Sequence, residues 1–217
     1  MKMNETILNL LFLIFVLTTV NIAYKGKVID KTSWKKVIFL SLWFISGGVI
    51  LLRNLDLNLL INFNLITVGT LALTTFTWFE FPKLIRHFGT FPSYYFKNKK
   101  GNTRFMVKFE HSSMTIKYFE VLFQQTTFLF ILFVILNDLT NANRIFLFTL
   151  IVTIIHLGNL LFMDYKWALF YTILSIPMAV LFGYMIINGF VLLTISIHLA
   201  FYLIFNARYW FIKDKLS

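Results

Sequence analysis

The stretch KYFEVLFQQTTFLFILF, from Lys117 to Phe133, places a glutamate and two glutamines at the start of a long apolar run. A run of about 20 apolar residues predicts a transmembrane helix, because that length crosses roughly 30 Å of hydrocarbon. An ionisable side chain inside such a helix costs on the order of 3 kcal/mol on insertion scales, so it normally faces the interior of a helix bundle. We therefore expect Glu120 to face a polar interior and not lipid.

The composition is typical of a polytopic membrane protein. Of the 217 residues, 59% are hydrophobic and only 13% are charged, whereas soluble domains carry about 25% charged residues. The chain has no cysteine, which excludes disulfides and cysteine-based metal sites. The net charge of +11 does not require a nucleic acid, because basic loops of membrane proteins face the cytoplasm and its anionic headgroups. We expect an all-α transmembrane bundle whose partners are membrane lipids.

The apolar runs predict a single multi-pass domain over residues 1–217. The domain would consist of three N-terminal spans within 1–79, a basic cytoplasmic loop over 80–115 and a core over 116–208. The stretch from Arg53 to Asn64 would lie at the membrane interface or extend the third span. The first run lacks a small-residue cleavage site, so we expect it to be retained. The seven expected spans lie near 6–24, 37–52, 58–79, 116–136, 145–163, 168–187 and 190–208.

The loop charges predict the orientation of these spans. Seven spans place 17 of the 20 basic residues on one side, Lys117 among them, and leave only Lys2, Arg53 and Arg144 on the other. The positive-inside rule then places the N-terminus outside and the C-terminus in the cytoplasm. The short loops suit a prokaryotic inner membrane.

One acid and two histidines lie inside the predicted spans. Glu120 is the only acid within an apolar span, and His156 and His198 each lie in the middle of another span. At 1.5 Å per residue they lie about 5, 10 and 15 Å from the cytoplasmic ends of their helices. This depth favours a shared cavity open to the cytoplasm. Alternatively, each histidine is a hydrogen-bonded core residue, Gln124 and Gln125 join helices, and Gln124, four residues after Glu120 on the same face, only orients the carboxylate.

These residues resemble the motifs of the CAAX-protease and bacteriocin-processing family of intramembrane endopeptidases, in particular its type 2 CAAX prenyl proteases. The family pattern is Glu-Glu-x-x-x-Arg, then Phe-x-x-x-His, then His-x-x-x-Asn/Asp on successive motif helices. The chain keeps the order Glu120, His156, His198, with IIHLGN around the first histidine. The resemblance covers roughly 115–208, including the stretch IPMAVLFGYMIINGFVLLTISIHLAFYLIFN, which starts at Ile176.

The chain departs from the family pattern at several positions. The first motif reads FEVLFQQ, so Gln124 or Gln125 replaces the arginine and Glu120 is either the first or the second glutamate. Val152 replaces the phenylalanine of the second motif, and Tyr202 replaces the Asn or Asp of the third. The nearby Asn159 and Asn206 are candidates to substitute for the missing amide.

The resemblance implies hydrolysis of a membrane-associated peptide or protein. Glu120 and His156 would activate water as general base, and His198 would stabilise the oxyanion, with no cofactor. Gln124, Gln125, Asn159, Tyr202 and Asn206 would support these three residues.

Three alternatives stay open at this point. The chain could be a catalytically inactive relative that acts as a membrane scaffold or immunity protein, which the altered first motif favours. It could be a zinc peptidase with Glu120, His156 and His198 as a His₂Glu ligand set. A transporter is a weaker fit, because the predicted spans contain no second acid to mark an ion path.

The charge distribution generates a prediction about topology. Reporter fusions after Arg144 and after Lys166 are expected to report opposite sides of the membrane, with Lys166 and the C-terminus in the cytoplasm. Fusions that place Arg144 and Lys166 on the same side would contradict the seven-span arrangement.

Overall fold

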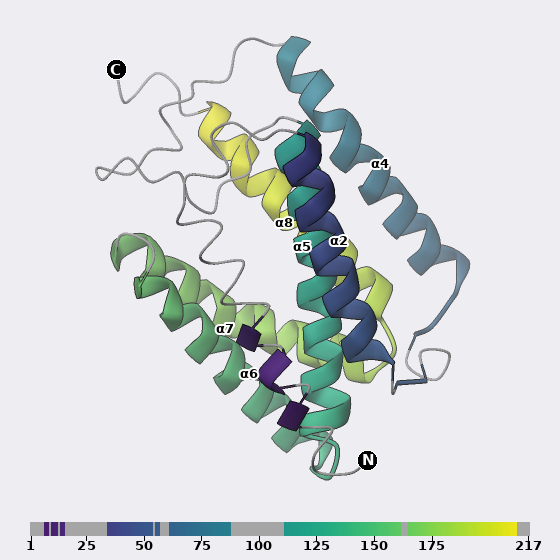
Figure 1. Ribbon diagram of the computed structural model, residues 1–217, viewed down its shortest axis with the longest axis vertical. Helices are drawn as coiled ribbons and strands as arrows, with labels where there is room; N and C mark the ends of the chain where they lie inside the picture. Colours follow the sequence, from purple (N-terminus) through teal and green to yellow (C-terminus); the bar gives the residue numbers. More distant parts are fainter. Residues whose placement is uncertain are drawn as a thin grey trace.

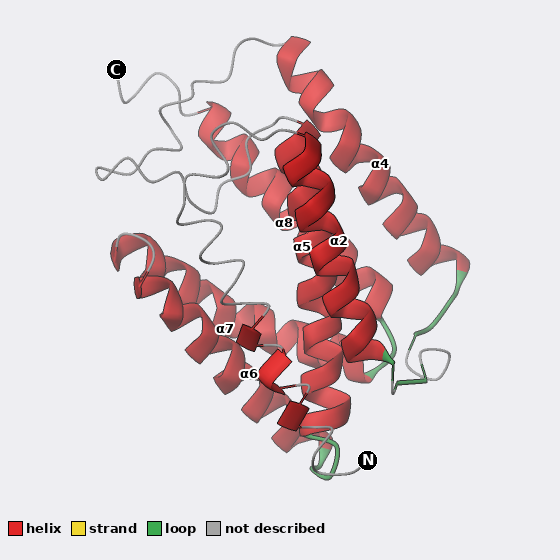
Figure 2. Cartoon of the chain, viewed as in Figure 1, coloured by secondary structure: helices red, strands yellow, loops and turns green. Residues whose placement is uncertain are grey.

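The structure of the protein is a computed structural model. It describes residues 7, 8, 10–12, 14, 15, 34–53, 55, 56, 61–87, 111–161 and 165–211, with some side chains near the helix ends left out. Six long helices and no strand occur in these ranges (Figures 1 and 2). Helix α5 continues as a π-helical turn over Ile131–Ile135, and α6 continues as a 3₁₀ turn over Gly158–Leu161. The helices are α2 (Trp34–Leu52), α4 (Leu65–His87), α5 (His111–Phe130), α6 (Asn141–Leu157), α7 (Tyr165–Ile187) and α8 (Val191–Phe211).

The described helices are those of a membrane protein. Met114–Ile135, Asn141–Leu160 and Ala168–Ile187 are each long and apolar enough to cross a bilayer, and Val37–Leu52, Leu65–Phe81 and Val191–Ile204 are shorter apolar helices. Large apolar side chains cover the outer faces, with Leu65 89% and Ile204 71% exposed. Such outward-facing side chains suit a lipid environment, because soluble monomers rarely expose apolar patches of this extent.

Most predicted spans coincide with a helix. Helices α2, α5, α6, α7 and α8 lie where spans were predicted, at 37–52, 116–136, 145–163, 168–187 and 190–208. The first predicted span, 6–24, falls mostly outside the described residues, and those of its residues that are described are helical.

The third span was predicted to start too early, whereas its predicted end at 79 agrees with the apolar part of α4, Leu65–Phe81. Helix α4 starts at Leu65, not near 58, because Asn64 caps it. The backbone N–H of Thr67 donates to Asn64 Oδ1 at 2.9 Å, and the Asn64 N–H donates to Thr67 Oγ1 at 3.3 Å. The helix also continues to His87, and α5 begins at His111, so both ends of the loop predicted over 80–115 are helical. The rest of that loop lies outside the described residues.

Helix α5 lies at the centre of the bundle (Figure 1). It contacts α2, α4 and α8, whereas α6 packs chiefly on α7. The Trp78 indole N–H of α4 donates to the Met114 carbonyl of α5 at 2.9 Å, and Phe44 of α2 packs on Phe123 of α5 with ring centroids 5.7 Å apart. The α6–α7 hairpin diverges from the other helices toward one end of the molecule (Figure 1).

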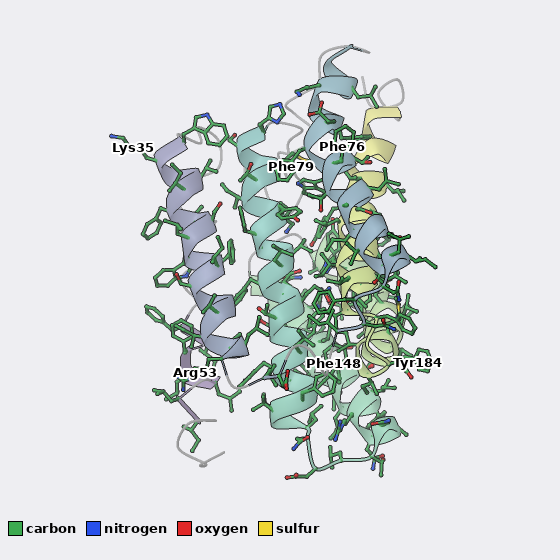
Figure 3. The ribbon with its side chains drawn as sticks, turned by 90° about the vertical axis from the view of Figure 1, so that its right-hand side faces the viewer. Lys35, Arg53, Phe76, Phe79, Phe148 and Tyr184 are labelled. Carbon is green, nitrogen blue, oxygen red and sulfur yellow. The ribbon has the colours of Figure 1, made fainter. Side chains whose placement is uncertain are left out.

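Successive described helices run in opposite directions (Figure 1). One end of the bundle therefore carries the start of α2, the end of α4, the start of α5, the α6–α7 connection and the end of α8. The opposite end carries the short connections 136–141 and 187–191. Figure 3 shows Lys35 and Arg53 at opposite ends of α2. The end that bears Lys35 is called the basic end below.

A tight turn at Gly189 joins α7 to α8. Gly189 has a φ of 82°, a left-handed conformation that glycine adopts without strain. The Phe190 N–H donates to the Met185 carbonyl at 2.9 Å and the Gly189 N–H to the Ile186 carbonyl at 3.0 Å, which is a Schellman motif. This turn holds α8 antiparallel to α7 and so places His198 across from the helix pair α6–α7.

The contact between α2 and α5 yields a prediction about stability. A Cβ added at Gly48 would lie 3.2 Å from Thr126 Oγ1, whereas one added at Gly69 of α4 meets nothing within 4 Å. Gly48→Leu is expected to lower the free energy of unfolding by about 1–3 kcal/mol through overpacking. The measurement is thermal unfolding in detergent followed by circular dichroism. Gly69→Leu is the matched control and should unfold within a degree or two of wild type. Equal destabilisation by both variants would contradict close α2–α5 packing.

Candidate active site

A buried ion pair lies on the inner face of α5. The Lys117 ammonium is 2.7 Å from Glu120 Oε1, and the Gln124 amide donates to the same oxygen at 3.1 Å. The three residues share one face because side chains three and four positions apart are neighbours on a helix. Lys117 is 6% and Glu120 8% exposed. The carboxylate is therefore held in place by two donors from its own helix.

The position of Lys117 corrects the sequence analysis, which counted it with the cytoplasmic loop residues. Helix α5 begins at His111, so Lys117 lies well inside the helix. Its Nζ also lies 4.5 Å from the centre of the Tyr202 ring, a cation–π contact with α8. An opposite charge three residues before Glu120 was the feature of the sequence that could have identified this pair.

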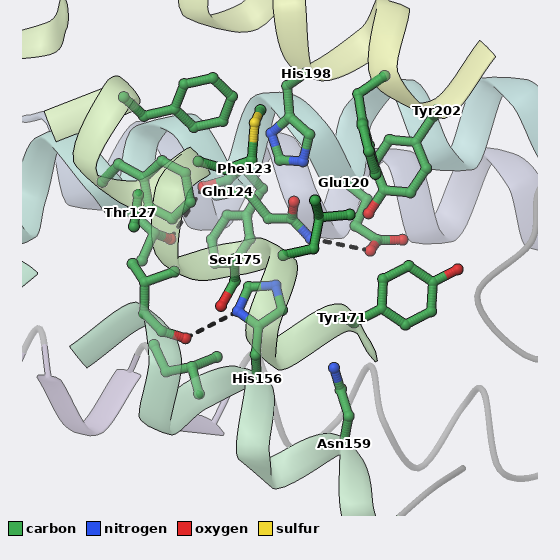
Figure 4. Close-up of a pocket in the computed structure, with 18 of the residues that line it drawn as sticks. Glu120, Phe123, Gln124, Thr127, His156, Asn159, Tyr171, Ser175, His198 and Tyr202 are labelled. Carbon is green, nitrogen blue, oxygen red and sulfur yellow. Dashed lines mark hydrogen bonds between the residues drawn. The ribbon is translucent and has the colours of Figure 1, made fainter. Parts of the chain in front are cut away.

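A cavity of about 270 Å³ opens beside the ion pair. Residues of α5, α6, α7 and α8 line it, and Phe44 adds a side chain from α2. Figure 4 shows His156 and His198 pointing into this cavity from opposite sides, with Glu120 and Tyr202 at one flank. Its polar lining consists of Lys117, Glu120, Gln124, Thr127, His156, Asn159, Tyr171, Ser175, His198 and Tyr202.

His156 presents an acceptor nitrogen to the cavity. Its Nδ1 lies 2.8 Å from the Val152 carbonyl, one turn earlier in α6. A carbonyl oxygen only accepts, so Nδ1 carries the proton, and a neutral ring then has its lone pair on Nε2. Val152 stands where the family motif has phenylalanine, and its backbone supplies this bond. His156 can therefore accept a proton at Nε2.

His198 is held by Gln125 and by a stack of aromatic rings. The Gln125 amide nitrogen lies 3.0 Å from His198 Nδ1. The Tyr202 ring stacks on the imidazole with centroids 5.4 Å apart, and Phe128 and Phe182 pack on it at 6.5 and 5.5 Å. An amide nitrogen donates, so the contact places the lone pair on Nδ1 and the proton on Nε2.

The structure brings the three predicted residues of the site to one cavity. Glu120, His156 and His198 all line it, as do the supporting residues Gln124, Asn159 and Tyr202. Gln125 does not line the cavity but holds His198 from behind. The side chain of Asn206 lies outside the described part of α8. Tyr171 and Ser175 also line the cavity and were not predicted, because a tyrosine and a serine in an apolar span carry no charge that would distinguish them from core residues.

The described residues do not form a ligand set for zinc. No three histidine, aspartate or glutamate side chains within them lie close enough together to hold a metal ion. Oxygen Oε1 of Glu120 is occupied by Lys117 and Gln124, and an ammonium at 2.7 Å would repel a cation. In this arrangement Oε1 of Glu120 serves Lys117 and Gln124, and the His₂Glu alternative stays a hypothesis.

No protein-family model, curated protein or solved structure matches this chain. The resemblance to the endopeptidase family thus depends on the motif residues alone.

The buried ion pair generates a prediction about stability. Lys117→Met leaves an uncompensated charge inside the bundle and is expected to destabilise the protein by about 3–5 kcal/mol. The double variant Lys117→Met/Glu120→Gln removes both charges and should recover most of that loss. Chemical unfolding in mixed micelles gives the three free energies.

The exposed pair Lys83–Glu80 of α4 is a matched control for this measurement. It has the same i,i+3 spacing and the same 2.7 Å separation, but its side chains are 61% and 43% exposed. Lys83→Met should cost less than about 1 kcal/mol, because solvent already screens these charges. A Lys117→Met variant as stable as Lys83→Met would show that the pair is not buried.

Proposed function

We propose that this protein is an intramembrane endopeptidase that hydrolyses a membrane-associated peptide or protein. The observation that supports the proposal is the joint presence of Glu120, His156 and His198 in one cavity. The two histidines offer it opposite hydrogen-bonding groups, an acceptor from His156 and a donor from His198. An acceptor to take a proton from water and a donor to bind an oxyanion are the two groups that peptide hydrolysis needs.

The reaction begins with a water between Glu120 and His156. Nε2 of His156 or the carboxylate takes a proton as the water oxygen attacks the carbonyl carbon of the peptide. The carbonyl oxygen becomes an oxyanion that accepts a hydrogen bond from Nε2–H of His198. The intermediate then collapses, the C–N bond breaks, and the protonated base returns its proton to the leaving amine. Each proton that leaves water is thereby accounted for.

Lys117 takes the part that the resemblance gives to an arginine. Its ammonium pairs with Glu120 Oε1 at 2.7 Å and so orients the carboxylate that would act as base. Gln124 adds a second hydrogen bond to the same oxygen. In place of the arginine of the first motif, Lys117 and Gln124 both bind Glu120, from one helical turn before it and one turn after it.

The cavity would open toward the cytoplasm in a prokaryotic inner membrane. Lys117 and Tyr171 each lie six residues from the basic end of their helices, about 9 Å at 1.5 Å per residue. The connections at this end carry most of the chain's lysines and arginines, so the positive-inside rule places it in the cytoplasm, with the N-terminus outside.

A catalytically inactive membrane scaffold or immunity protein is the second candidate. The Lys117–Glu120 pair favours it, since a buried carboxylate that is paired and hydrogen-bonded has a structural role without catalysis. This candidate predicts no hydrolysis and tolerance of changes at both histidines.

Peptide cleavage in proteoliposomes tests the proposal. Wild type is expected to cleave at least one member of a panel of prenylated peptides and leader peptides, with or without chelator. Glu120→Gln and His198→Ala are each expected to lose about 10²–10⁴ of the rate, the usual contribution of a general base or an oxyanion donor. Glu80→Gln and His111→Ala are matched controls outside the cavity and should cleave like wild type.

The other outcomes separate the candidates. If wild type cleaves no member of the panel, or if Glu120→Gln and His198→Ala cleave like wild type, the scaffold candidate is favoured. Inactivation by chelator would favour the zinc alternative.

A further inference from the structure

Gln125 joins α5 to α8 behind the cavity. It is 1% exposed and makes two hydrogen bonds, both to α8. The Thr194 hydroxyl lies 2.9 Å from Gln125 Oε1, and Gln125 Nε2 lies 3.0 Å from His198 Nδ1. Thr194 and His198 are one helical turn apart, so a single amide spans both residues. Because His198 lines the cavity, the hydrogen bond from Gln125 affects which nitrogen of this ring carries the proton there.

We infer that Gln125 is a positioning residue that holds His198 in the tautomer with its proton on Nε2, facing the cavity. A primary amide has a donor end and an acceptor end. Its donor end faces Nδ1, so Nδ1 must accept, and a neutral imidazole then carries its one proton on Nε2. Its acceptor end faces the Thr194 hydroxyl, which donates.

Rotating the Gln125 amide by about 180° would favour the other tautomer of His198. With Oε1 toward His198, Nδ1 would carry the proton and Nε2 would offer a lone pair. Thr194 could accommodate that state, because its hydroxyl also lies 2.7 Å from the Val191 carbonyl and could donate there. Two complete hydrogen-bond chains therefore exist, and the structure adopts the one that ends in a donor at the cavity.

His156 has no such choice. Its Nδ1 faces a backbone carbonyl, which cannot become a donor. Its tautomer is fixed by the α6 backbone, whereas the tautomer of His198 is set by a side chain that can be mutated. His156 offers the cavity an acceptor and His198 a donor, because a carbonyl oxygen binds Nδ1 of the first ring and an amide nitrogen binds Nδ1 of the second.

The assignment of the tautomer does not depend on catalysis, but its consequence for rate rests on the proposed function. If His198 donates to the oxyanion, then a change at Gln125 that moves the proton to Nδ1 removes that donor. The substrate still binds, so the loss should appear in kcat and not in KM.

Nitrogen NMR of the full-length protein in lipid bilayers, labelled with ¹⁵N-histidine, tests the assignment. Single substitutions of His87, His111, His156 and His198 assign the signals. Wild type is expected to show a protonated Nε2 for His198 and a protonated Nδ1 for His156. A protonated Nδ1 and bare Nε2 at His198 would overturn the inference.

Two variants test the role of Gln125 itself. In Gln125→Glu the carboxylate only accepts, so Nδ1 of His198 is expected to become protonated. Gln125→Met keeps the length of the side chain and removes both hydrogen bonds, so both tautomers of His198 should appear. His156 is the internal control and should keep its signals in both variants. A His198 that stays purely Nε2-protonated in either variant would refute the role of Gln125.

Cleavage by the same variants separates this inference from the proposed function. Gln125→Glu is expected to lower kcat by about 10²-fold, the usual cost of one oxyanion donor, with KM within about twofold of wild type. If wild type cleaves nothing but the tautomers follow the predictions, the proposed function fails and the inference stands. If wild type cleaves and the tautomers do not follow, the inference fails alone.

Discussion

The buried pair of Lys117 and Glu120 constrains the rest of the bundle. Two opposite charges inside a membrane helix are tolerable only if they meet each other and are shielded from lipid. Helix α5 meets this demand by lying at the centre, with α2, α4 and α8 against it. Gln124 and the Tyr202 ring add a hydrogen bond and a cation–π contact to the pair. The cavity therefore lies beside the Lys117–Glu120 ion pair, which is shielded from lipid because α5 is surrounded by other helices.

The sequence predicted the helices well and identified several of the polar residues that line the cavity. Apolar runs place α5 through α8 correctly, because length and hydrophobicity decide which segments can span a bilayer. The start of α4 was misplaced since the side-chain caps of Asn64 and Thr67 depend on local geometry. Glu120, His156 and His198 were found because ionisable residues are rare in spans. Lys117 was missed for a related reason, since a lysine near a helix end is usually assigned to the adjacent loop.

The roles of the two glutamines were predicted in part. The i+4 spacing predicted the contact of Gln124 with Glu120, and Gln125 joins two helices as expected of a buried amide, but the sequence did not identify His198 as its partner. Gln124 and Gln125 are adjacent and chemically identical, yet helical geometry turns them about 100° apart. One meets Glu120 on the same helix, and the other meets His198 on α8. Which glutamine replaces the motif arginine therefore has no single answer. Gln124 shares the carboxylate with Lys117, and Gln125 acts on a different member of the site.

The presence of Glu120 is a weaker argument for catalysis than the presence of His156. Once Lys117 is buried, an apolar residue at position 120 would strand a positive charge, so stability alone explains the glutamate. His156 has no such structural need, because its partner is a backbone carbonyl of its own helix, whereas His198 accepts from the buried Gln125 amide. Each ring binds the protein through Nδ1, and Nε2 has no protein partner within the described residues. If a histidine in a span served packing alone, leucine or phenylalanine at that position would give a more stable protein, because it avoids burying a polar ring. Both rings are held by the protein through Nδ1 and line the same cavity, which is the arrangement that the proposed hydrolysis requires.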